Sequence, residues 1–302
     1  MVGSTGLNMP AFLRTSVPFG TTVRTQPVVA APRRVLLQRT TASGALLSVT
    51  EAQGIRQLHL GTTVQSEVCV SNAGELETAL VEEWTQLIVA LAYGWVAERR
   101  EIAAEGRRAL LLGCGGGVIA RALLPLLAVH IVELEPEVFE AAQSHFGLKL
   151  GERCTSDVGC AVAWLERQVP LAARAFEIVI VDCFTADGLA GGVADGSMLA
   201  RLADVVGDGG LCVVNLHTCP GKSLEERTEA DWEGARCAMS RLRARFACVY
   251  ALPARSCQNV LAVCHQGATR SPTCWQALVE AGLRHGAAAA CPDIRSTAIH
   301  AH

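Results

Sequence analysis

The sequence predicts an α/β fold in which a parallel sheet with helices on both faces follows a small antiparallel β domain. Three observations predict it. Strand-like and helix-like segments alternate from about residue 109 to residue 264. A glycine-rich loop joins the first of these strands to a helix. Short β-type runs separated by glycines precede both. With 302 residues, half of them hydrophobic, the chain can form one large domain and a smaller one.

The first fifty residues differ in composition from the rest of the chain. No acidic residue occurs before Glu51, and arginine, serine and threonine are abundant. This composition is typical of an organelle transit peptide, with a disordered tail as the alternative. We expect residues 1–32 to stay outside the core. The 13 cysteines are interpreted as reduced thiols, so the expected location is intracellular: a plastid or a mitochondrion, otherwise the cytoplasm.

The next segment, residues 33–72, is predicted to be a β-hairpin domain. Its β-type runs form an antiparallel sheet and are Val35–Gln38, Ala45–Thr50, Ile55–Leu60 and Val64–Val68. Apolar residues at helical spacing then predict a helix over Glu75–Tyr93.

The larger domain is expected to span residues 73–266. Its predicted strands are Ala109–Leu112, Val129–Glu133, Phe176–Val181, Leu211–Leu216, Cys248–Leu252 and Asn259–Cys264. Helices are expected at Val118–Leu127, from Pro136 to about Phe146, at Met198–Val206 and over Leu224–Phe246. Residues 267–302 are expected to be weakly ordered.

Charge and hydropathy exclude several classes of protein. The formal net charge is −3, which argues against a basic nucleic-acid binder. No run of 18 apolar residues occurs, so we expect no membrane span. The histidines and cysteines do not fall at ligand spacing, so we expect no metal site.

A cofactor site is predicted at the glycine-rich loop. The loop contains Gly113, Gly115 and Gly117, and it runs directly from a strand into a helix. Glycines allow a cofactor to approach the helix N-terminus closely. Glu133 ends the next strand 20 residues after Gly113, where a carboxylate can accept both hydroxyl groups of a ribose.

The loop sequence favours a sulfonium cofactor over a dinucleotide. It reads GCGGGV and lacks the third glycine of the dinucleotide motif. S-adenosylmethionine needs no pyrophosphate site. It needs the glycine loop, an acid for the ribose, and a carboxylate or amide for the adenine amine. Asp157 is placed for the last role, and Asp182, at the end of a later strand, faces the same crevice.

These residues resemble the spermidine-synthase-like family over roughly residues 35–265. The resemblance is carried by LLGCGGGV, VELEPEVFEAAQSHFGL, FEIVIVDCFTADGLA, GGLCVVNLH and the upstream segment IRQLHLGTTVQSEV. It implies a Rossmann-like S-adenosylmethionine-dependent methyltransferase fold. It also implies that Gln65, the glycine loop, Glu133 and Asp157 contact the cofactor. Asp182 corresponds to the family's catalytic aspartate.

Departures from the aminopropyltransferase pattern favour the methyltransferase-like branch of that family. Gly115 stands where aminopropyltransferases carry an aspartate, Thr185 replaces the second acid after the fourth strand, and Trp84 lies in the altered tyrosine-bearing helix start. The resemblance therefore implies methyl transfer to an amine, on a small molecule or a protein side chain. The oligomeric state stays open, and a homodimer is one alternative. Two other functions stay open: an aminopropyltransferase using decarboxylated S-adenosylmethionine, and a non-catalytic binding module.

Overall fold

The computed structural model describes residues 32–99, 107–168, 176–185, 188–217, 232–254, 259–267 and 272–292. The predicted transit-peptide-like segment falls outside these ranges except for its last residue. About the first third of the helix predicted over Leu224–Phe246 also falls outside them. Within the described ranges, no helix is both long and apolar enough to span a membrane.

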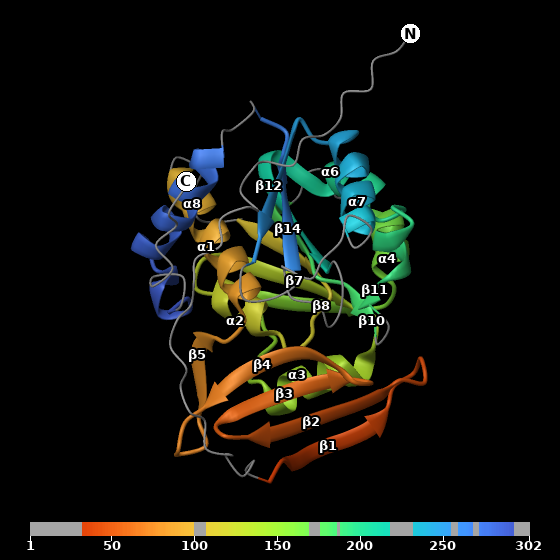
Figure 1. The fold of residues 1–302 in the computed structure, drawn as a ribbon, viewed down its shortest axis with the longest axis vertical. Helices are drawn as coiled ribbons and strands as arrows, with labels where there is room; N and C mark the ends of the chain where they lie inside the picture. The colour runs from red at the N-terminus through yellow and green to blue at the C-terminus, as the bar shows by residue number, and fades with distance from the viewer. Residues whose placement is uncertain are drawn as a thin grey trace, which may run out of the picture.

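The N-terminal domain is an antiparallel meander, as the sequence predicts, but it has five strands instead of the four expected (Figure 1). Its strands, each paired with the next, are β1 (Arg34–Thr40), β2 (Leu46–Ala52), β3 (Ile55–Leu60), β4 (Thr63–Val70) and β5 (Leu76–Leu80). The helix expected over Glu75–Tyr93 is wrong in its first part. Leu76 and Leu80 pair with β4, and helix α1 (Glu83–Glu98) begins only after them. The sheet thus continues to Leu80, beyond the domain boundary expected at residue 72.

The larger domain contains a seven-stranded sheet in the order β13-β14-β12-β9-β6-β7-β8. Its strands are β6 (Arg108–Leu112), β7 (Ala128–Glu133), β8 (Cys154–Val158), β9 (Phe176–Val181), β12 (Val206–His217), β13 (Cys248–Pro253) and β14 (Asn259–His265). Among these seven strands β14 alone runs opposite to the other six. The order reverses at β6 and β9, because β7 and β8 extend the sheet on one side and β12 on the other. The predicted α/β architecture is confirmed.

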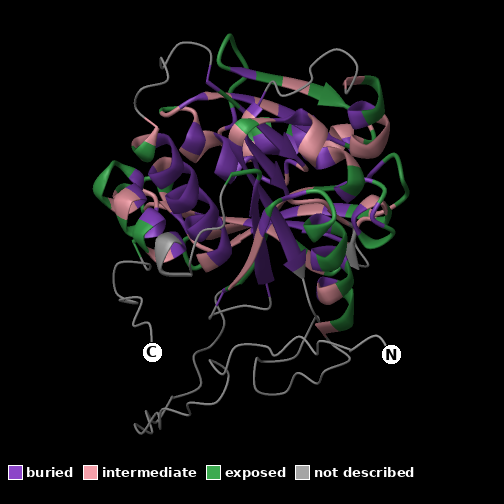
Figure 2. Ribbon diagram, turned by 90° about the horizontal axis from the view of Figure 1, so that it is seen from above, coloured by how far each residue is buried: buried purple, intermediate pink, exposed green. Residues whose placement is uncertain are grey.

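Helices cover both faces of this sheet and enclose two apolar cores (Figures 1 and 2). Because successive strand side chains point to opposite faces, Ala109 and Leu111 enter one core while Leu110 and Leu112 enter the other. The first core contains side chains of α1, α2 (Val118–Leu123) and α3 (Pro136–His145). The second contains those of α4 (Ala161–Gln168), α6 (Leu199–Val205) and α7 (Glu233–Arg243). The shorter elements are β10 (Phe184–Thr185), β11 (Gly188–Leu189), α5 (Gly191–Ala194) and the 3₁₀ turn Ala287–Ala289.

The C-terminal segment is more regular than the sequence predicts. Helix α8 (Pro272–Arg284) packs so closely on α1 that only glycine fits at two positions. A Cβ atom on Gly94 would lie 1.9 Å from the Leu278 carbonyl oxygen, and one on Gly282 would lie 1.9 Å from that of Ala90. The expectation of weak order is therefore wrong for residues 272–292, because packing against α1 orders an Ala-rich segment that has little local pattern. Residues 293–302 lie outside the described ranges.

The two domains are held together beside helix α3. Arg39 on β1 forms a salt bridge with Glu140, at 2.8 Å, and Arg56 on β3 donates to the carbonyl of His145. On the other side of the interface the Gly116 N–H donates to Ser66 Oγ of β4, at 2.8 Å. These contacts place the N-terminal sheet directly beneath the carboxyl ends of the parallel strands.

Candidate active site

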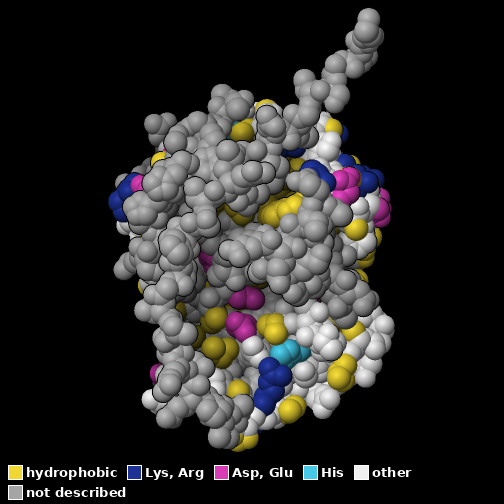
Figure 3. All heavy atoms as spheres, in the orientation of Figure 1, with side chains coloured by type: hydrophobic (Ala, Val, Ile, Leu, Met, Phe, Trp, Pro, Cys, Tyr) yellow, Lys and Arg dark blue, Asp and Glu magenta, His cyan; other side chains and the backbone are white. Residues whose placement is uncertain are grey.

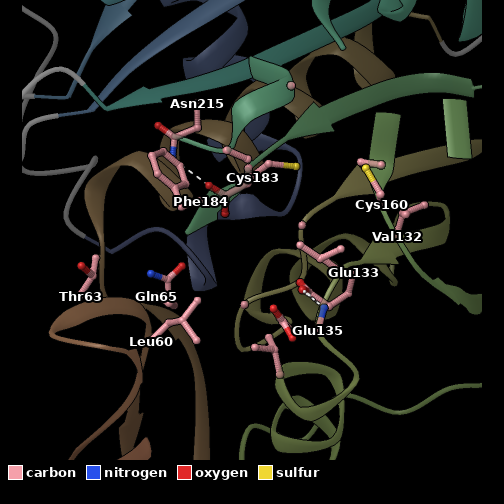
Figure 4. Close-up of a pocket in the computed structure, with 18 of the residues that line it drawn as sticks. Leu60, Thr63, Gln65, Val132, Glu133, Glu135, Cys160, Cys183, Phe184 and Asn215 are labelled. Atoms are coloured by element: carbon pink, nitrogen blue, oxygen red, sulfur yellow. Dashed lines mark hydrogen bonds between the residues drawn. The ribbon is translucent and has the colours of Figure 1, made fainter. Parts of the chain in front are cut away.

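A cavity of about 760 Å³ lies between the N-terminal sheet and the carboxyl edge of the parallel strands (Figure 4). This edge includes the ends of β6 and β9, where the strand order reverses, and open α/β sheets bind ligands at such a point. Acidic side chains are visible within the hollow in the space-filling view (Figure 3). The acids in its wall are Glu82, Glu133, Glu135 and Asp182.

The glycine loop forms one wall of the cavity, and residues larger than glycine do not fit at the glycine positions of this loop. Gly113, Gly115 and Gly117 have φ angles of 90°, 50° and 68°, in the region that favours glycine. A Cβ atom on Gly113 would lie 2.1 Å from the Asp182 carbonyl oxygen, and one on Gly115 would lie 2.7 Å from Ser66 Oγ. Gly113 and Gly115 line the cavity, whereas Gly117 is the residue before α2 and lies against Leu148.

Glu133 lies at the end of β7, in the cavity wall and only 8% exposed. Its Oε2 accepts the backbone N–H of Cys114 at 2.7 Å, and its Oε1 accepts that of Glu135 at 2.9 Å. Burial raises the pKa of Glu133, and these N–H donors oppose the shift. A carboxylate has about four lone-pair positions, so two donors leave capacity for a bound ribose. Glu133 therefore holds the glycine loop in place as well as facing the cavity.

Gln65 on β4 also lines the cavity, as the family resemblance implies. Its amide nitrogen is buried and has no hydrogen-bond partner among the described residues. Figure 4 shows this side chain extending from the N-terminal sheet towards the opposite wall. An unpartnered buried N–H group is costly unless a ligand accepts its hydrogen bond. The position of Gln65 thus fits a cofactor that presents an acceptor such as a carboxylate.

Asp157 does not join the other predicted site residues. It lies within β8, where its Oδ2 accepts the indole N–H of Trp164 at 2.6 Å and lies 3.3 Å from Nε2 of His130. It is absent from the cavity wall, which is formed instead by the residues that follow β8, from Gly159 to Val162. The sequence places Asp157 correctly beside the crevice. The sequence pattern does not predict that the side chain of Asp157 points towards Trp164 and not into the cavity.

Asp182 follows β9 and borders the cavity next to Gly113. The side-chain amide of Asn215 donates to its Oδ1 at 2.9 Å, and a dashed line from Asn215 marks this bond in Figure 4. Burial raises the pKa of Asp182 to about 7, the charge of Glu133 adds to the shift, and the Asn215 hydrogen bond opposes it. Near neutral pH this carboxyl group can both accept and release a proton.

Glu82 is a cavity residue that the sequence reasoning missed. It is the residue before α1, and burial, with the charges of Glu67 and Asp182, raises its pKa to about 8. A helix assumed to start at Glu75 places Glu82 in the middle of that helix. In the structure Glu82 lies at the break between β5 and α1, in the cavity wall and near enough to Asp182 for their charges to interact. The available signal was the pair of acids before Trp84, in the altered helix start.

Comparisons with known proteins agree with this architecture. No family model matches the chain. A curated relative, the eEF1A lysine and N-terminal methyltransferase of Danio rerio, is 25% identical over 150 residues. The match covers 47% of this chain and 20% of the relative, so the chain spans about a fifth of that protein's length.

Two solved structures show the likeness in three dimensions. A probable spermidine synthase from Corynebacterium glutamicum superposes with a TM-score of 0.64 at 16% identity, over 83% of this chain and 88% of that one. Human methyltransferase-like protein 13, in complex with SAH, gives 0.55 at 16% identity, over 68% and 92%. The chain thus has the fold common to spermidine synthases and S-adenosylmethionine-dependent methyltransferases, as predicted.

Proposed function

We propose that this protein is an S-adenosylmethionine-dependent methyltransferase that modifies an amine. The observation that carries the proposal is the placement of Asp182. Asp182 directly follows the central strand β9, beside the glycine loop. Only one of its carboxyl oxygens accepts a hydrogen bond from a described residue. The similarity to a lysine and N-terminal methyltransferase supports this assignment.

The cofactor half of the cavity fits an adenosyl sulfonium. Glu133 would hold the ribose, the backbone after β8 would border the adenine, and Gln65 would donate to the methionine carboxylate. Bound there, the cofactor supplies a methyl group already activated on sulfur. Gly115 leaves no carboxylate in the loop. The absence of an acid at this position favours the cofactor that keeps its own carboxylate, because like charges repel.

The acceptor half of the cavity fits a cationic amine. Glu82 and Asp182 lie close enough for the charge of Asp182 to raise the pKa of Glu82, and both line the cavity. An ammonium group would satisfy these carboxylates through charge-assisted hydrogen bonds. The acceptor must lose a proton before its nitrogen lone pair can attack. Asp182 would take that proton first and leave a neutral amine. The amine lone pair would then form the N–C bond as the S–C bond breaks and the neutral thioether departs, and the cavity mainly aligns the two reactants.

Aminopropyl transfer is the second candidate because of Glu82. The sequence departure at Thr185 removes one acid that a diamine would need, but Glu82 supplies another carboxyl group near Asp182. A non-catalytic module would bind neither cofactor productively. Calorimetric titrations with S-adenosylmethionine and with its decarboxylated form separate these alternatives.

The decisive experiment uses S-adenosylmethionine with a deuterated methyl group. We would incubate the purified protein with lysine-containing peptides, peptides with free N-terminal amines, and simple diamines, and follow each acceptor by mass spectrometry. Transfer of the labelled methyl group to one amine, lost in the Asp182→Asn variant, is the expected result. Preferential binding of the decarboxylated cofactor, with transfer of a propylamine group from it, would overturn the proposal. Lack of binding to either form would favour the non-catalytic alternative.

A further inference from the structure

A short chain of amide groups ends at Asp182. Asn259 Nδ2 donates to Asn215 Oδ1 at 2.9 Å, and Asn215 Nδ2 donates to Asp182 Oδ1 at 2.9 Å. Asn215 is 1% exposed and Asn259 is 9% exposed, so both amides are shielded from bulk water. Both also border the cavity.

The reversed strand β14 explains how Asn259 reaches this place. The parallel strands all bring their carboxyl ends to the cavity, and Asn215 lies near the end of β12. Because β14 runs in the opposite direction, its first residue comes to the same edge, and Asn259 pairs with His217 in the ladder. A parallel strand in this position would carry its first residue to the far edge of the sheet.

The two hydrogen bonds of this chain run in one direction, from Asn259 towards Asp182. A side-chain amide can present either its NH₂ group or its oxygen to a neighbour. When Asn259 donates to the Asn215 oxygen, the Asn215 NH₂ group must face Asp182. An amide turned the other way would place its oxygen against the carboxylate, which is repulsive and would favour the protonated acid.

We infer that Asn259 is a positioning residue, which orients Asn215 so that Asp182 is held as a carboxylate with Oδ2 directed to the acceptor. The inference rests on the proposed function for the role of Asp182, but not for the geometry. Asp182 Oδ2 makes no hydrogen bond with any residue in the described ranges, so it is available to a ligand. The ionisable groups around Asp182 are Glu133, Glu82 and the thiols of Cys114 and Cys183. All of them are acids, and Asn215 is the one side-chain hydrogen-bond donor to Asp182 among the described residues.

The test compares Asn259→Leu and Asn259→Asp with the unmodified protein. Both replacements keep the branched shape of asparagine. Leucine cannot donate to Asn215, and an aspartate cannot do so once it is ionised. The first readout is the ¹³C chemical shift of the Asp182 carboxyl carbon, assigned through Asp182→Asn and followed against pH. We expect its titration midpoint to rise by about half to one pH unit in Asn259→Leu, and by more in Asn259→Asp.

The second readout is kcat as a function of pH. We expect the acidic limb to move upward by the same amount, with activity about three- to tenfold lower at pH 6 and restored at high pH. Affinity for S-adenosylmethionine should stay unchanged. Thr50→Val is the matched control, because it removes the buried hydrogen bond to His59 in the N-terminal sheet, away from the cavity. It should move neither readout.

Each outcome decides between the proposals. An unmoved Asp182 midpoint in both folded variants overturns the positioning role. A higher KM for the acceptor at every pH, with an unshifted kcat profile, would mean that Asn259 contacts the acceptor directly, and this also overturns it. A shifted midpoint in a protein that methylates no amine would support the role of Asn259 and reject the proposed function.

Discussion

The two halves of the cavity hold their carboxylates in different ways. In the cofactor half, Glu133 accepts two backbone N–H groups, one from the glycine loop and one from its own turn. In the acceptor half, Asp182 accepts a side-chain amide, and its pKa and that of Glu82 rise to about 7 and about 8. Backbone donors follow directly from the path of the chain, so the cofactor half is rigid and recognisable from spacing. A side-chain donor can be replaced by substitution while the path of the backbone stays the same, and in this sense the acceptor half is adjustable.

The largest effect should come from breaking the rigid half at Gly113. Gly113→Ala places a Cβ atom 2.1 Å from the Asp182 carbonyl oxygen, at a φ of 90° that alanine rarely adopts. We expect a loss of about 3 kcal/mol or more in the free energy of unfolding, and no detectable cofactor binding. Thermal unfolding and calorimetry measure the two effects. Gly151→Ala is the control, because a Cβ atom there would have no neighbour within 4 Å and its φ is not positive. Normal binding by Gly113→Ala would show that the loop is not the cofactor site.

The next largest effect separates chemistry from binding. Asp182→Asn keeps the shape of the side chain but removes the proton acceptor, so we expect kcat to fall about 10²-fold or more. The dissociation constant for S-adenosylmethionine should change by less than about threefold, because Asp182 serves the acceptor half. Steady-state kinetics and calorimetry give the two numbers. Loss of cofactor binding in Asp182→Asn, with an unchanged rate for the complex that still forms, would mean that Asp182 belongs to the cofactor half and not to the acceptor half.

Glu133→Ala should damage both binding and stability. Loss of the ribose acceptor is expected to weaken cofactor binding about tenfold to hundredfold. The N–H groups of Cys114 and Glu135 also lose their partner, which should cost roughly 1–3 kcal/mol of stability. From the sequence alone the fold would be expected to tolerate this change, because Glu133 ends a strand. A variant with full cofactor affinity would exclude Glu133 from the cofactor site.

The difference between the halves also explains what the sequence could predict. Strand–loop–helix spacing located the glycine loop, Glu133 and Asp182, because each follows a strong apolar run and parallel strands end at one edge. The places of Glu82 and Asn259 depend on the pairing of β5 with β4, where the sequence predicts a helix, and on the reversal of β14. Such pairings form between segments that a local pattern does not connect. The α1–α8 contact joins segments far apart in the chain, so it too is outside the reach of the sequence pattern.

Glu82→Gln tests the adjustable half through stability. Glu82 and Asp182 have raised pKa values, so the folded chain keeps protons that the unfolded chain has released. The free energy of unfolding should therefore fall as the pH rises from about 4 to 8. Without the Glu82 charge, the variant should be more stable than the unmodified protein by about 1–3 kcal/mol at pH 9, and equal to it near pH 4. Urea unfolding at both pH values measures this, with the exposed Glu77→Gln as control. Equal stability at pH 9 would show that Glu82 is not confined in the cavity.

Asp157→Asn should have the smallest effect, and it tests whether Asp157 belongs to the cofactor half. The side chain accepts the Trp164 indole N–H and lies beside His130, outside the cavity wall. An asparagine oxygen can still accept from the indole, so we expect a loss of about 1 kcal/mol or less in stability. Affinity for S-adenosylmethionine should be unchanged, because the adenine would face the backbone from Gly159 to Val162. Leu134→Ala, beside Glu133 in the wall, is the contrasting variant and should weaken binding severalfold by loss of apolar contact. If Asp157→Asn weakened cofactor binding more than Leu134→Ala, this carboxylate would have to turn from Trp164 to the adenine amine when the cofactor binds, as the family resemblance implies.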